Sequence, residues 1–244
     1  MFDTAHSVDQ QAALQHATTQ HAVTPLRQGP PPEARGVPDE HLLPPLPVAT
    51  SITKRLFDIL VASSALLVFL PLLAMLAILI RLDAPGPALF RQRRTGLRGQ
   101  VFTIYKLRTM TVVEDADNVR QATKNDARVT QIGAVLRKLS LDELPQLFNV
   151  LVGDMSIVGP RPHAIAHDEF YSERIPTYGD RFRARPGLTG FAQISGYRGE
   201  VRELKQMTDR IGADNAYIDR WSLGLDLMIA VKTLPLMLRD PNAY

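Results

Sequence analysis

The chain has 244 residues, enough for one sizeable domain and a tail, and two domains are possible. It contains no cysteine, which excludes disulfide frameworks and cysteine-based metal sites and favours a reducing compartment. The net charge is only +3, but residues 1–50 hold two basic and five acidic residues, so the remainder carries +6. A basic body favours an anionic partner, such as a phosphate ligand, nucleic acid or an anionic membrane surface.

Residues 1–50 are expected to form a disordered leader. Eight of the 18 prolines lie there, and a segment of this composition cannot offset its ordering entropy by burying apolar surface. A secretory signal is not expected, because the first part of the leader is polar and the main apolar run begins much later.

The main apolar run extends from Ile59 to Ile80, 22 residues without a charge. A straight helix of this length would span a bilayer core of about 30 Å. However, Pro71 near the middle removes a helical hydrogen bond, and basic residues flank both ends, which places both ends on the cytoplasmic side. Residues 51–82 therefore fit a re-entrant, kinked helical hairpin, while a proline-kinked spanning helix fits the same residues equally well.

A β-hairpin is predicted after this run. The stretches Leu89–Arg93 and Val101–Arg108 flank a turn that contains Gly96 and Gly99. Residues 81–111 contain seven basic residues and a single acidic one. Such a patch beside a membrane segment would lie against lipid phosphates or bind a phosphate ligand, and it would serve equally well as a topology determinant.

The remainder of the chain is predicted to be helix-rich. Residues 111–138 have a polar helical pattern, and a short helix follows Ser140. The stretch from Trp221 to Leu238 is apolar with charged interruptions, so it fits an interfacial helix with its tryptophan at the headgroup level or, equally, a core helix. The expected fold class is α+β and helix-rich, with a membrane-associated apolar segment at residues 51–82, either re-entrant or spanning, followed by a compact domain at residues 83–244.

The sharpest local motif is the stretch Ser140 to Pro145. One interpretation is a helix capping box, in which Ser140 caps the helix and Glu143 reaches back to the cap. The other is a pair of adjacent carboxylates, Asp142 and Glu143. One of them could attack phosphorus while the other holds a metal or takes a proton. The start of a helix also suits a bound phosphate.

Two further turns could bind a ligand. Glycine and proline surround Arg161 and would present its guanidinium to phosphate oxygens, although an ordinary turn with a solvated arginine has the same pattern. The stretch Arg185 to Gln193 is a glycine-rich turn that suits close approach of a ligand. The chain has neither a P-loop nor a G-x-G-x-x-G motif.

Several stretches stand in a fixed order along the chain. They are Lys54-Arg55 with Asp58, the apolar segment with Pro71, Lys106 to Met110, Ser140 to Pro145, Asn149, Met155 to Pro162, and Pro186 to Gln193. Together they resemble the bacterial sugar transferase family, the monotopic phosphoglycosyl transferases that begin polysaccharide and glycan assembly. The resemblance covers about Lys54 to Tyr244.

The resemblance implies an enzyme of the bacterial inner membrane with a re-entrant helix and an active site that faces the cytoplasm. Asp142 would attack the β-phosphorus of a UDP-sugar, release UMP and keep the phosphosugar on its carboxylate. Undecaprenyl phosphate would then take up the phosphosugar. Mg²⁺, held by Asp142 and Glu143, would neutralise the diphosphate, and Glu143 could instead act as a base.

The resemblance also implies roles for basic residues. Arg161 would bind phosphate, Lys54 and Arg55 would lie near the lipid phosphate, and Arg108 and Arg185 would line the polar site. The C-terminal part resembles members that transfer hexose 1-phosphate, with glucose the first expectation and galactose the second. Inner-membrane lipid is an expected partner, and a homodimer is possible.

Two other classes of function account for part of the sequence. A non-catalytic membrane scaffold of a polysaccharide assembly complex would use the apolar hairpin and the basic patch, but it would have no use for the Asp142-Glu143 pair. A nucleic-acid binder would explain the basic patch but not the apolar run, so no nucleic-acid partner is expected.

Overall fold

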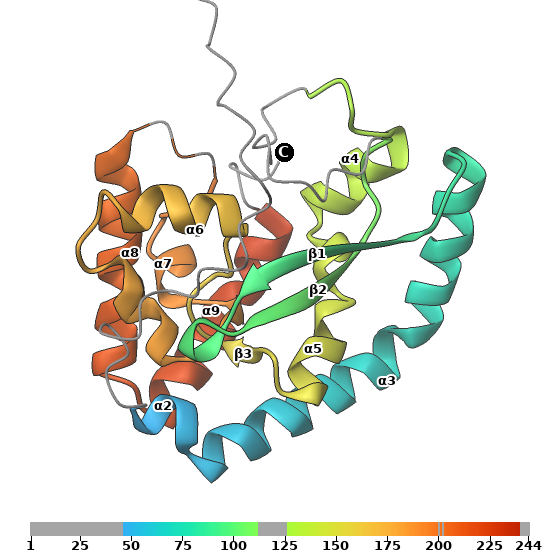
Figure 1. Ribbon diagram of the computed structural model, residues 1–244. Helices are drawn as coiled ribbons and strands as arrows, with labels where there is room; N and C mark the ends of the chain where they lie inside the picture. The colour runs from blue at the N-terminus through green and yellow to red at the C-terminus, as the bar shows by residue number, and fades with distance from the viewer. Residues whose placement is uncertain (1–45, 112–125, 200, 202, 240–244) are drawn as a thin grey trace, which may run out of the picture. The chain divides into compact units, whose positions relative to one another are not determined.

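The structure is a computed structural model that describes residues 46–111, 126–199, 201 and 203–239 (Figure 1). Of residues 237–239 it describes the backbone alone. All of these residues belong to one compact unit, Gly36–Tyr244. Within them the predicted α+β, helix-rich class is confirmed, because helices surround two small sheets of two strands each.

Helix α2, Pro47–Thr50, precedes the apolar segment and buries Val48 and Ala49. The sequence places these four residues in the predicted leader, whereas the structure has them in a short helix. The apolar side chain of Val48 finds a place in the main core, and that burial offsets the cost of ordering the backbone. Residues 1–45 lie outside the described residues, where the leader stays a prediction.

Helix α3, Ile52–Asp83, contains the apolar run and is 32 residues long. Ser51 caps it, since its side chain accepts a hydrogen bond from the backbone N–H of Lys54 at 3.3 Å. The helix continues through Pro71, and Figure 1 shows that it bends along its length rather than running straight. The described backbone is thus one bent helix, and a hairpin of two helical arms is not confirmed.

One face of α3 packs on the rest of the domain along the whole helix. The buried residues recur at helical spacing: Lys54, Asp58, Ala62, Leu66, Leu73, Leu76 and Ile80. The other side presents large apolar side chains, among them Leu60, Leu67, Val68, Ile78 and Leu82. Within the described residues α3 is the one helix long and apolar enough to cross a membrane. Re-entry into a bilayer stays a prediction.

The predicted β-hairpin is confirmed. Strands β1, Leu89–Thr95, and β2, Val101–Leu107, pair antiparallel, and the turn η2, Leu97–Gly99, joins them. Asn149 fastens this hairpin to the helix behind it, because its side chain accepts from the N–H of Tyr105 at 3.1 Å and donates to the carbonyl of Thr103 at 2.7 Å.

The region after the hairpin is less helical than predicted. Helix α4, Gln131–Lys138, covers the end of the predicted helix 111–138, residues 126–130 form a turn and a bridge, and residues 112–125 lie outside the described residues. Thr130 starts α4 by accepting a hydrogen bond from Gly133 at 3.0 Å. The short helix predicted after Ser140 is present in two pieces, the 3₁₀ turn η3, Leu141–Glu143, and helix α5, Gln146–Val152.

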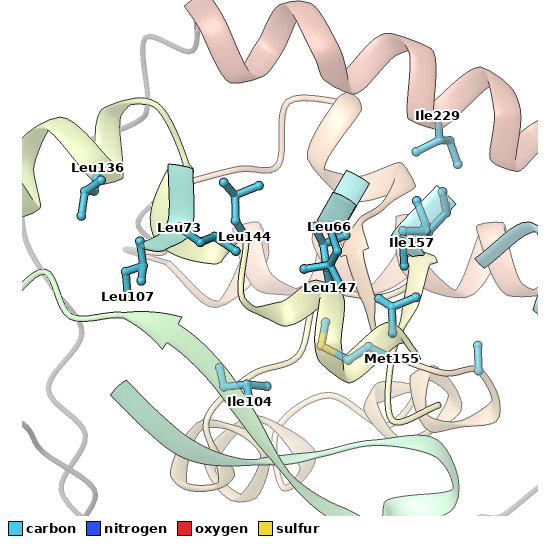
Figure 2. Close-up of a cluster of buried hydrophobic side chains, with 14 of the residues drawn as sticks. Leu66, Leu73, Ile104, Leu107, Leu136, Leu144, Leu147, Met155, Ile157 and Ile229 are labelled. Atoms are coloured by element: carbon cyan, nitrogen blue, oxygen red, sulfur yellow. The ribbon is translucent and has the colours of Figure 1, made fainter. Parts of the chain in front are cut away.

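Strands β3, Ser156–Val158, and β4, Gly187–Thr189, form a parallel pair. The remaining elements are α6, Ile165–Ser172; η4, Tyr178–Arg183; α7, Phe191–Ile194; α8, Leu204–Asp219; and α9, Leu223–Arg239. Figure 2 shows the core they enclose, where side chains from α3, β2, α5, β3 and α9 meet.

Helix α9 has the features of both predicted alternatives. Asp226 and Ile229 are fully buried, so the helix is part of the core, while Leu227, Val231 and Leu234 are exposed on it. The indole N–H of Trp221 donates to the carboxylate of Asp226 at 3.0 Å. Since its polar group has an internal partner, Trp221 serves the fold, and a membrane contact of α9 stays a prediction.

Candidate active site

The motif at residues 140–145 does not form the capping box that one interpretation predicted. Ser140 has a left-handed backbone, with φ 54° and ψ 23°, and its side chain makes no capping bond. Its hydroxyl instead accepts a hydrogen bond from Arg198 at 2.8 Å. The Glu143 side chain turns away from the helix end toward cations, because charge-assisted hydrogen bonds are stronger than a bond to a neutral cap.

Glu143 is held by two cations from different parts of the chain. Lys106 of β2 donates to Oε1 at 2.8 Å. Arg161 donates to both oxygens, to Oε1 at 2.5 Å and to Oε2 at 3.2 Å. Burial alone would raise the pKa of Glu143, but the charges of Arg161 and Lys106 outweigh it and hold this pKa well below the usual range. Glu143 is therefore ionised and immobilised.

Asp142 lies in a different environment, although it is the adjacent residue. Within the described residues its carboxylate makes no hydrogen bond and no ion pair. Burial and the charge of Glu143 raise its pKa to about 6, against the opposing effects of Lys106, Arg137 and Arg161. Two neighbouring carboxylates with pKa values pushed apart suit two different roles. Asp142 is mostly ionised at neutral pH and is free to react.

The turn that carries Arg161 depends on close backbone packing. The N–H of Gly159 donates to the carbonyl of Thr189 at 2.9 Å, and Gly187 donates to Pro160 at 2.8 Å. A Cβ on Gly159 would lie 2.3 Å from the carbonyl oxygen of Arg185, so only glycine fits there. The two glycine- and proline-rich turns of the sequence are thus packed together as one unit, which carries Arg161.

The other predicted basic residues have partners at helix ends. Arg55 donates to the carbonyls of Val150 and Leu151 at 2.6 and 2.7 Å, in the last turn of α5. Arg185 donates to Ala49 at 2.6 Å and to Gly153 at 3.0 Å. Such contacts satisfy carbonyls that have no partner within the helix.

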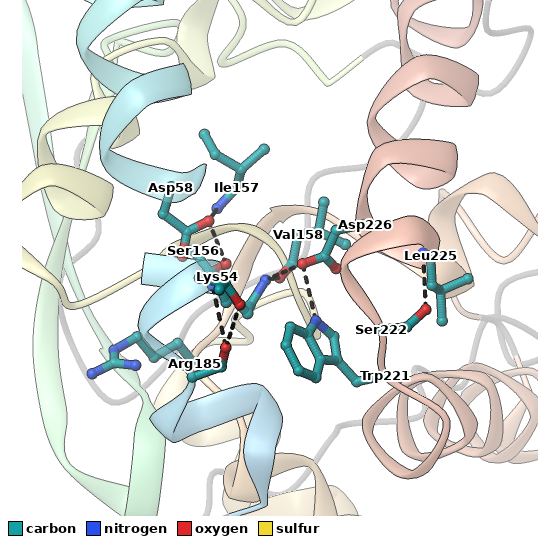
Figure 3. Close-up of polar contacts among 12 residues, drawn as sticks. Lys54, Asp58, Ser156, Ile157, Val158, Arg185, Trp221, Ser222, Leu225 and Asp226 are labelled. Atoms are coloured by element: carbon teal, nitrogen blue, oxygen red, sulfur yellow. Dashed lines mark hydrogen bonds and ion pairs between the residues drawn. The ribbon is translucent and has the colours of Figure 1, made fainter. Parts of the chain in front are cut away.

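Arg108 and Lys54 hold the two ends of α3. Arg108 donates to three backbone carbonyls at the C-terminal end of α3, those of Ile80, Ala84 and Pro85. Lys54 is buried and donates to the carboxylate of Asp226 at 2.8 Å and to the carbonyl of Val158 at 3.0 Å, as Figure 3 shows. Of the five basic residues predicted for the site, Arg161 is the one that contacts the carboxylate pair. The phosphate and lipid roles of Lys54, Arg55, Arg108 and Arg185 stay predictions.

A sequence model of the bacterial sugar transferase family matches residues 49–240. The chain belongs to the bacterial sugar transferase family. The resemblance drawn from the motifs of the sequence is therefore confirmed.

The chain is also similar to individual named proteins. The chain is 54% identical, over 201 residues, to a protein of Caulobacter vibrioides named UDP-glucose:undecaprenyl-phosphate glucose-1-phosphate transferase, an alignment that covers 82% of this chain and 75% of the relative. A protein of Klebsiella pneumoniae with the same name is 48% identical, with 87% of this chain and 46% of the relative covered. The exopolysaccharide production protein PSS of Rhizobium leguminosarum is 46% identical, with 75% and 94% covered. The chain thus spans less than half of the Klebsiella relative.

Lys106 is the site residue that the sequence analysis did not single out. It stands in the stretch Lys106 to Met110, which also contains Arg108, the residue predicted for the site. Arg108 lies just beyond the end of β2 and turns to the end of α3, whereas Lys106 lies within the strand and faces Glu143. The sequence could have indicated Lys106, because it is a basic residue inside the predicted second strand of the hairpin.

A magnesium ion is compatible with the carboxylate pair. Mg²⁺ is usually held by one or two carboxylates together with substrate phosphates and water. Asp142 has oxygens without a hydrogen-bond partner among the described residues, while Glu143 would have to share its oxygens with Lys106 and Arg161. Within the described residues, no group of three or more His, Cys, Asp or Glu side chains could hold a metal ion. The magnesium prediction therefore depends on oxygens from the substrate.

Proposed function

We propose that this chain transfers glucose 1-phosphate from UDP-glucose to undecaprenyl phosphate through a covalent intermediate on Asp142, as the first step of exopolysaccharide synthesis. The observation that carries the proposal is the unequal carboxylate pair. Asp142 is unbonded within the described residues and has a pKa near 6, while Glu143 is fixed by Arg161 and Lys106. The names of the relatives supply the substrates and the sugar.

In the first step an Asp142 carboxylate oxygen bonds to the β-phosphorus of UDP-glucose. The bond from that phosphorus to the bridging oxygen breaks, and UMP leaves with the bond's electron pair. In the second step a phosphate oxygen of undecaprenyl phosphate attacks the same phosphorus. The Asp142 carboxylate leaves unchanged, and undecaprenyl diphosphate glucose is formed. Splitting the transfer in this way replaces one difficult displacement by two easier ones.

Arg161 and Lys106 are suited to stabilise the charge that gathers on the phosphoryl oxygens. They lie beside the nucleophile and carry several donors in fixed positions, so little reorganisation is needed as the charge develops. Glu143 contributes by holding both cations in place. Magnesium, held by Asp142 and Glu143, is proposed as the cofactor, and it would neutralise part of the diphosphate charge.

A scaffold without activity would leave this arrangement without a use, since it needs neither a free carboxylate nor fixed cations. We further propose that the active site faces the cytoplasm at the inner membrane. The basic residues that flank α3 at both ends support that side.

The proposal is tested by incubating the purified chain in detergent with undecaprenyl phosphate, Mg²⁺ and, in turn, UDP-glucose, UDP-galactose or UDP-N-acetylgalactosamine, while UMP is measured. We expect turnover with UDP-glucose, and without the lipid a single burst of UMP that leaves the phosphosugar on the protein. Asp142→Asn should release no UMP, whereas Asp209→Asn, which alters an exposed ion pair, should have wild-type activity. Wild-type turnover in Asp142→Asn would exclude the nucleophile, and no UMP from any UDP-sugar would exclude the function.

A further inference from the structure

A second arginine, Arg181 of η4, forms hydrogen bonds to the turn that carries Arg161. One nitrogen of Arg181, Nη2, donates to the backbone carbonyl of Arg161, and the other, Nη1, contacts Nδ1 of His163 at 2.6 Å. Arg181 is only 3% exposed. Burial and the charge of Arg181 keep the pKa of His163 well below its ordinary value, so this ring is neutral and accepts the hydrogen bond.

A third arginine completes the hold on this turn. Arg94 of β1 donates to the carbonyl of Pro162 at 3.5 Å, and its backbone forms an isolated bridge with Ala164. Arg94 and Arg181 together therefore bond three consecutive residues, 161–163, from two different elements. None of these contacts touches the guanidinium of Arg161, which is left to face Glu143.

Arg181 is itself fixed by a buried polar cluster. Its guanidinium lies 3.4 Å from Asp214 of α8 and 3.6 Å from Asp168 of α6. It also donates to the hydroxyl of Tyr178 at 3.1 Å, and that hydroxyl donates to Asp168 at 2.7 Å. Asp214 is 1% exposed, and burial raises its pKa to about 6 against the lowering effect of Arg181. The cluster thus fixes the direction of the guanidinium from three sides.

Such a cluster is a costly way to stabilise a fold. Removing each charge from water carries a large desolvation cost, and apolar side chains of similar volume often fill the same space at least as well. What a buried ionic cluster supplies is a single geometry, because each charge must keep its partners. Here the atoms that it fixes are the backbone of the turn that presents Arg161.

We propose that Arg181, held by Asp214 and Asp168, is a positioning residue that fixes residues 161–163 so that the Arg161 guanidinium reaches the carboxylate pair. The inference rests on the proposed function of the same site. It assigns a task to a cluster that makes no contact with Asp142 or Glu143 in the described residues.

The first test is Arg181→Lys, in which one ammonium group replaces a fork that bonds several partners at once. We expect kcat/KM for UDP-glucose to fall roughly 10- to 100-fold, the range produced by losing charge-assisted hydrogen bonds. The matched control is Arg183→Lys on the same 3₁₀ helix, where the side chain pairs with exposed Asp219. That control should keep the wild-type kcat/KM.

Two further readouts separate positioning from general destabilisation. Asp142 is faced by Glu143, Lys106, Arg137 and Arg161. Displacement of Arg161 alone removes one positive charge, so the acidic limb of the pH–rate profile should move to higher pH in Arg181→Lys. Amide hydrogen exchange should also rise in the peptide that covers residues 156–164, compared with the control. Should Arg181→Lys fail to fold, Asp214→Asn provides the same readouts with an uncharged side chain of the same shape.

The results decide the inference in either direction. A shifted acidic limb with faster exchange at 156–164 supports it. An unchanged kcat/KM overturns it, and so does a loss of activity without either change, because a merely structural residue would give that result. A wild-type protein that releases no UMP from any UDP-sugar would instead overturn the proposed function, and the exchange comparison would still decide whether Arg181 fixes the turn.

Discussion

The role of Lys54 can be decided by removing its charge. The residue is 4% exposed, and its ammonium group lies 2.8 Å from the carboxylate of Asp226, which is fully buried. In Lys54→Met the aliphatic part of the side chain is kept and the charge is lost. Among the described residues, Asp226 would then keep as side-chain donors the Tyr217 hydroxyl at 2.7 Å and the Trp221 indole at 3.0 Å.

The expected loss of stability is large, because an unpaired carboxylate would remain in the interior. Breaking a buried pair by removing one partner costs about 3–5 kcal/mol. For a chain of this size each kcal/mol lowers Tm by roughly 2–4 °C, so we expect a decrease of roughly 6–20 °C. The double variant Lys54→Met/Asp226→Asn should recover much of this loss, since neither buried charge remains while the amide oxygen still accepts from Tyr217 or Trp221.

The assay is thermal unfolding of the detergent-solubilised chain, followed by circular dichroism. Lys205→Met is the matched control, because Lys205 pairs with Asp209 on the surface and an exposed pair contributes little to stability. The reasoning would be refuted by a Lys54→Met protein that unfolds like wild type and has a raised KM for undecaprenyl phosphate. That result would restore the lipid-phosphate role that the sequence suggested.

Three other predictions concern the site and its support. Turnover should fall about tenfold per pH unit below pH 6, because the proposed nucleophile Asp142 has to be ionised to attack and its pKa is about 6. An acidic limb near pH 4 in a pH–rate profile would contradict this. Glu143→Gln should reduce kcat at least tenfold and move the acidic limb to lower pH, since the charge of Glu143 raises the pKa of Asp142. An acidic limb at the wild-type pH would show that Glu143 does not raise the pKa of Asp142. Gly187→Ala should lower Tm strongly, because the new Cβ would lie 2.1 Å from the backbone nitrogen of Gly159. The control Gly212→Ala, in open space on α8, should be neutral or slightly stabilising. Equal Tm values for the two variants would show that the backbones at Gly187 and Gly159 can move apart.

Local sequence pattern was enough to predict the regular elements. The alternation in Val101–Leu107 and the glycines of the turn gave the hairpin, and the apolar run gave α3. The capping box failed because Ser140 and Glu143 find partners far along the chain, Arg198 and Arg161. A local rule compares only neighbouring groups, and a distant cation that folding brings close can outcompete a helix end.

The basic residues show a second limit of the sequence. Arg55, Arg108 and Arg185 are chemically as well suited to phosphate as Arg161 is, and their residue type does not separate the roles. The structure separates them, since the first three donate to backbone carbonyls at helix ends. Lys106 reaches Glu143 only because β2 lies beside η3, an arrangement that depends on tertiary packing. The cluster around Arg181 joins η4, α6, α8 and the turn at residues 161–163, and it has no sequence pattern within any one of them.

The contacts of α3 bear on its topology, because both of its ends are fastened to the same unit. Lys54 pairs with Asp226 near the first turn, and Arg108 bonds carbonyls at the last turn. A helix of 32 residues is about 48 Å long, longer than a bilayer core of about 30 Å. If it spanned, the polar unit packed along its whole length would have to enter the hydrocarbon region with it, where unpaired polar groups are costly.

We therefore expect both ends of α3 on one side of the membrane. The chain contains no cysteine, so single cysteines at the exposed positions Thr53 and Gln100 can be labelled without a background. A thiol reagent that does not cross the inner membrane should leave both unlabelled in intact cells and label both after permeabilisation. Labelling of Thr53→Cys but not Gln100→Cys in intact cells would show that α3 spans, and the contacts of Lys54 and Arg108 could then not exist together.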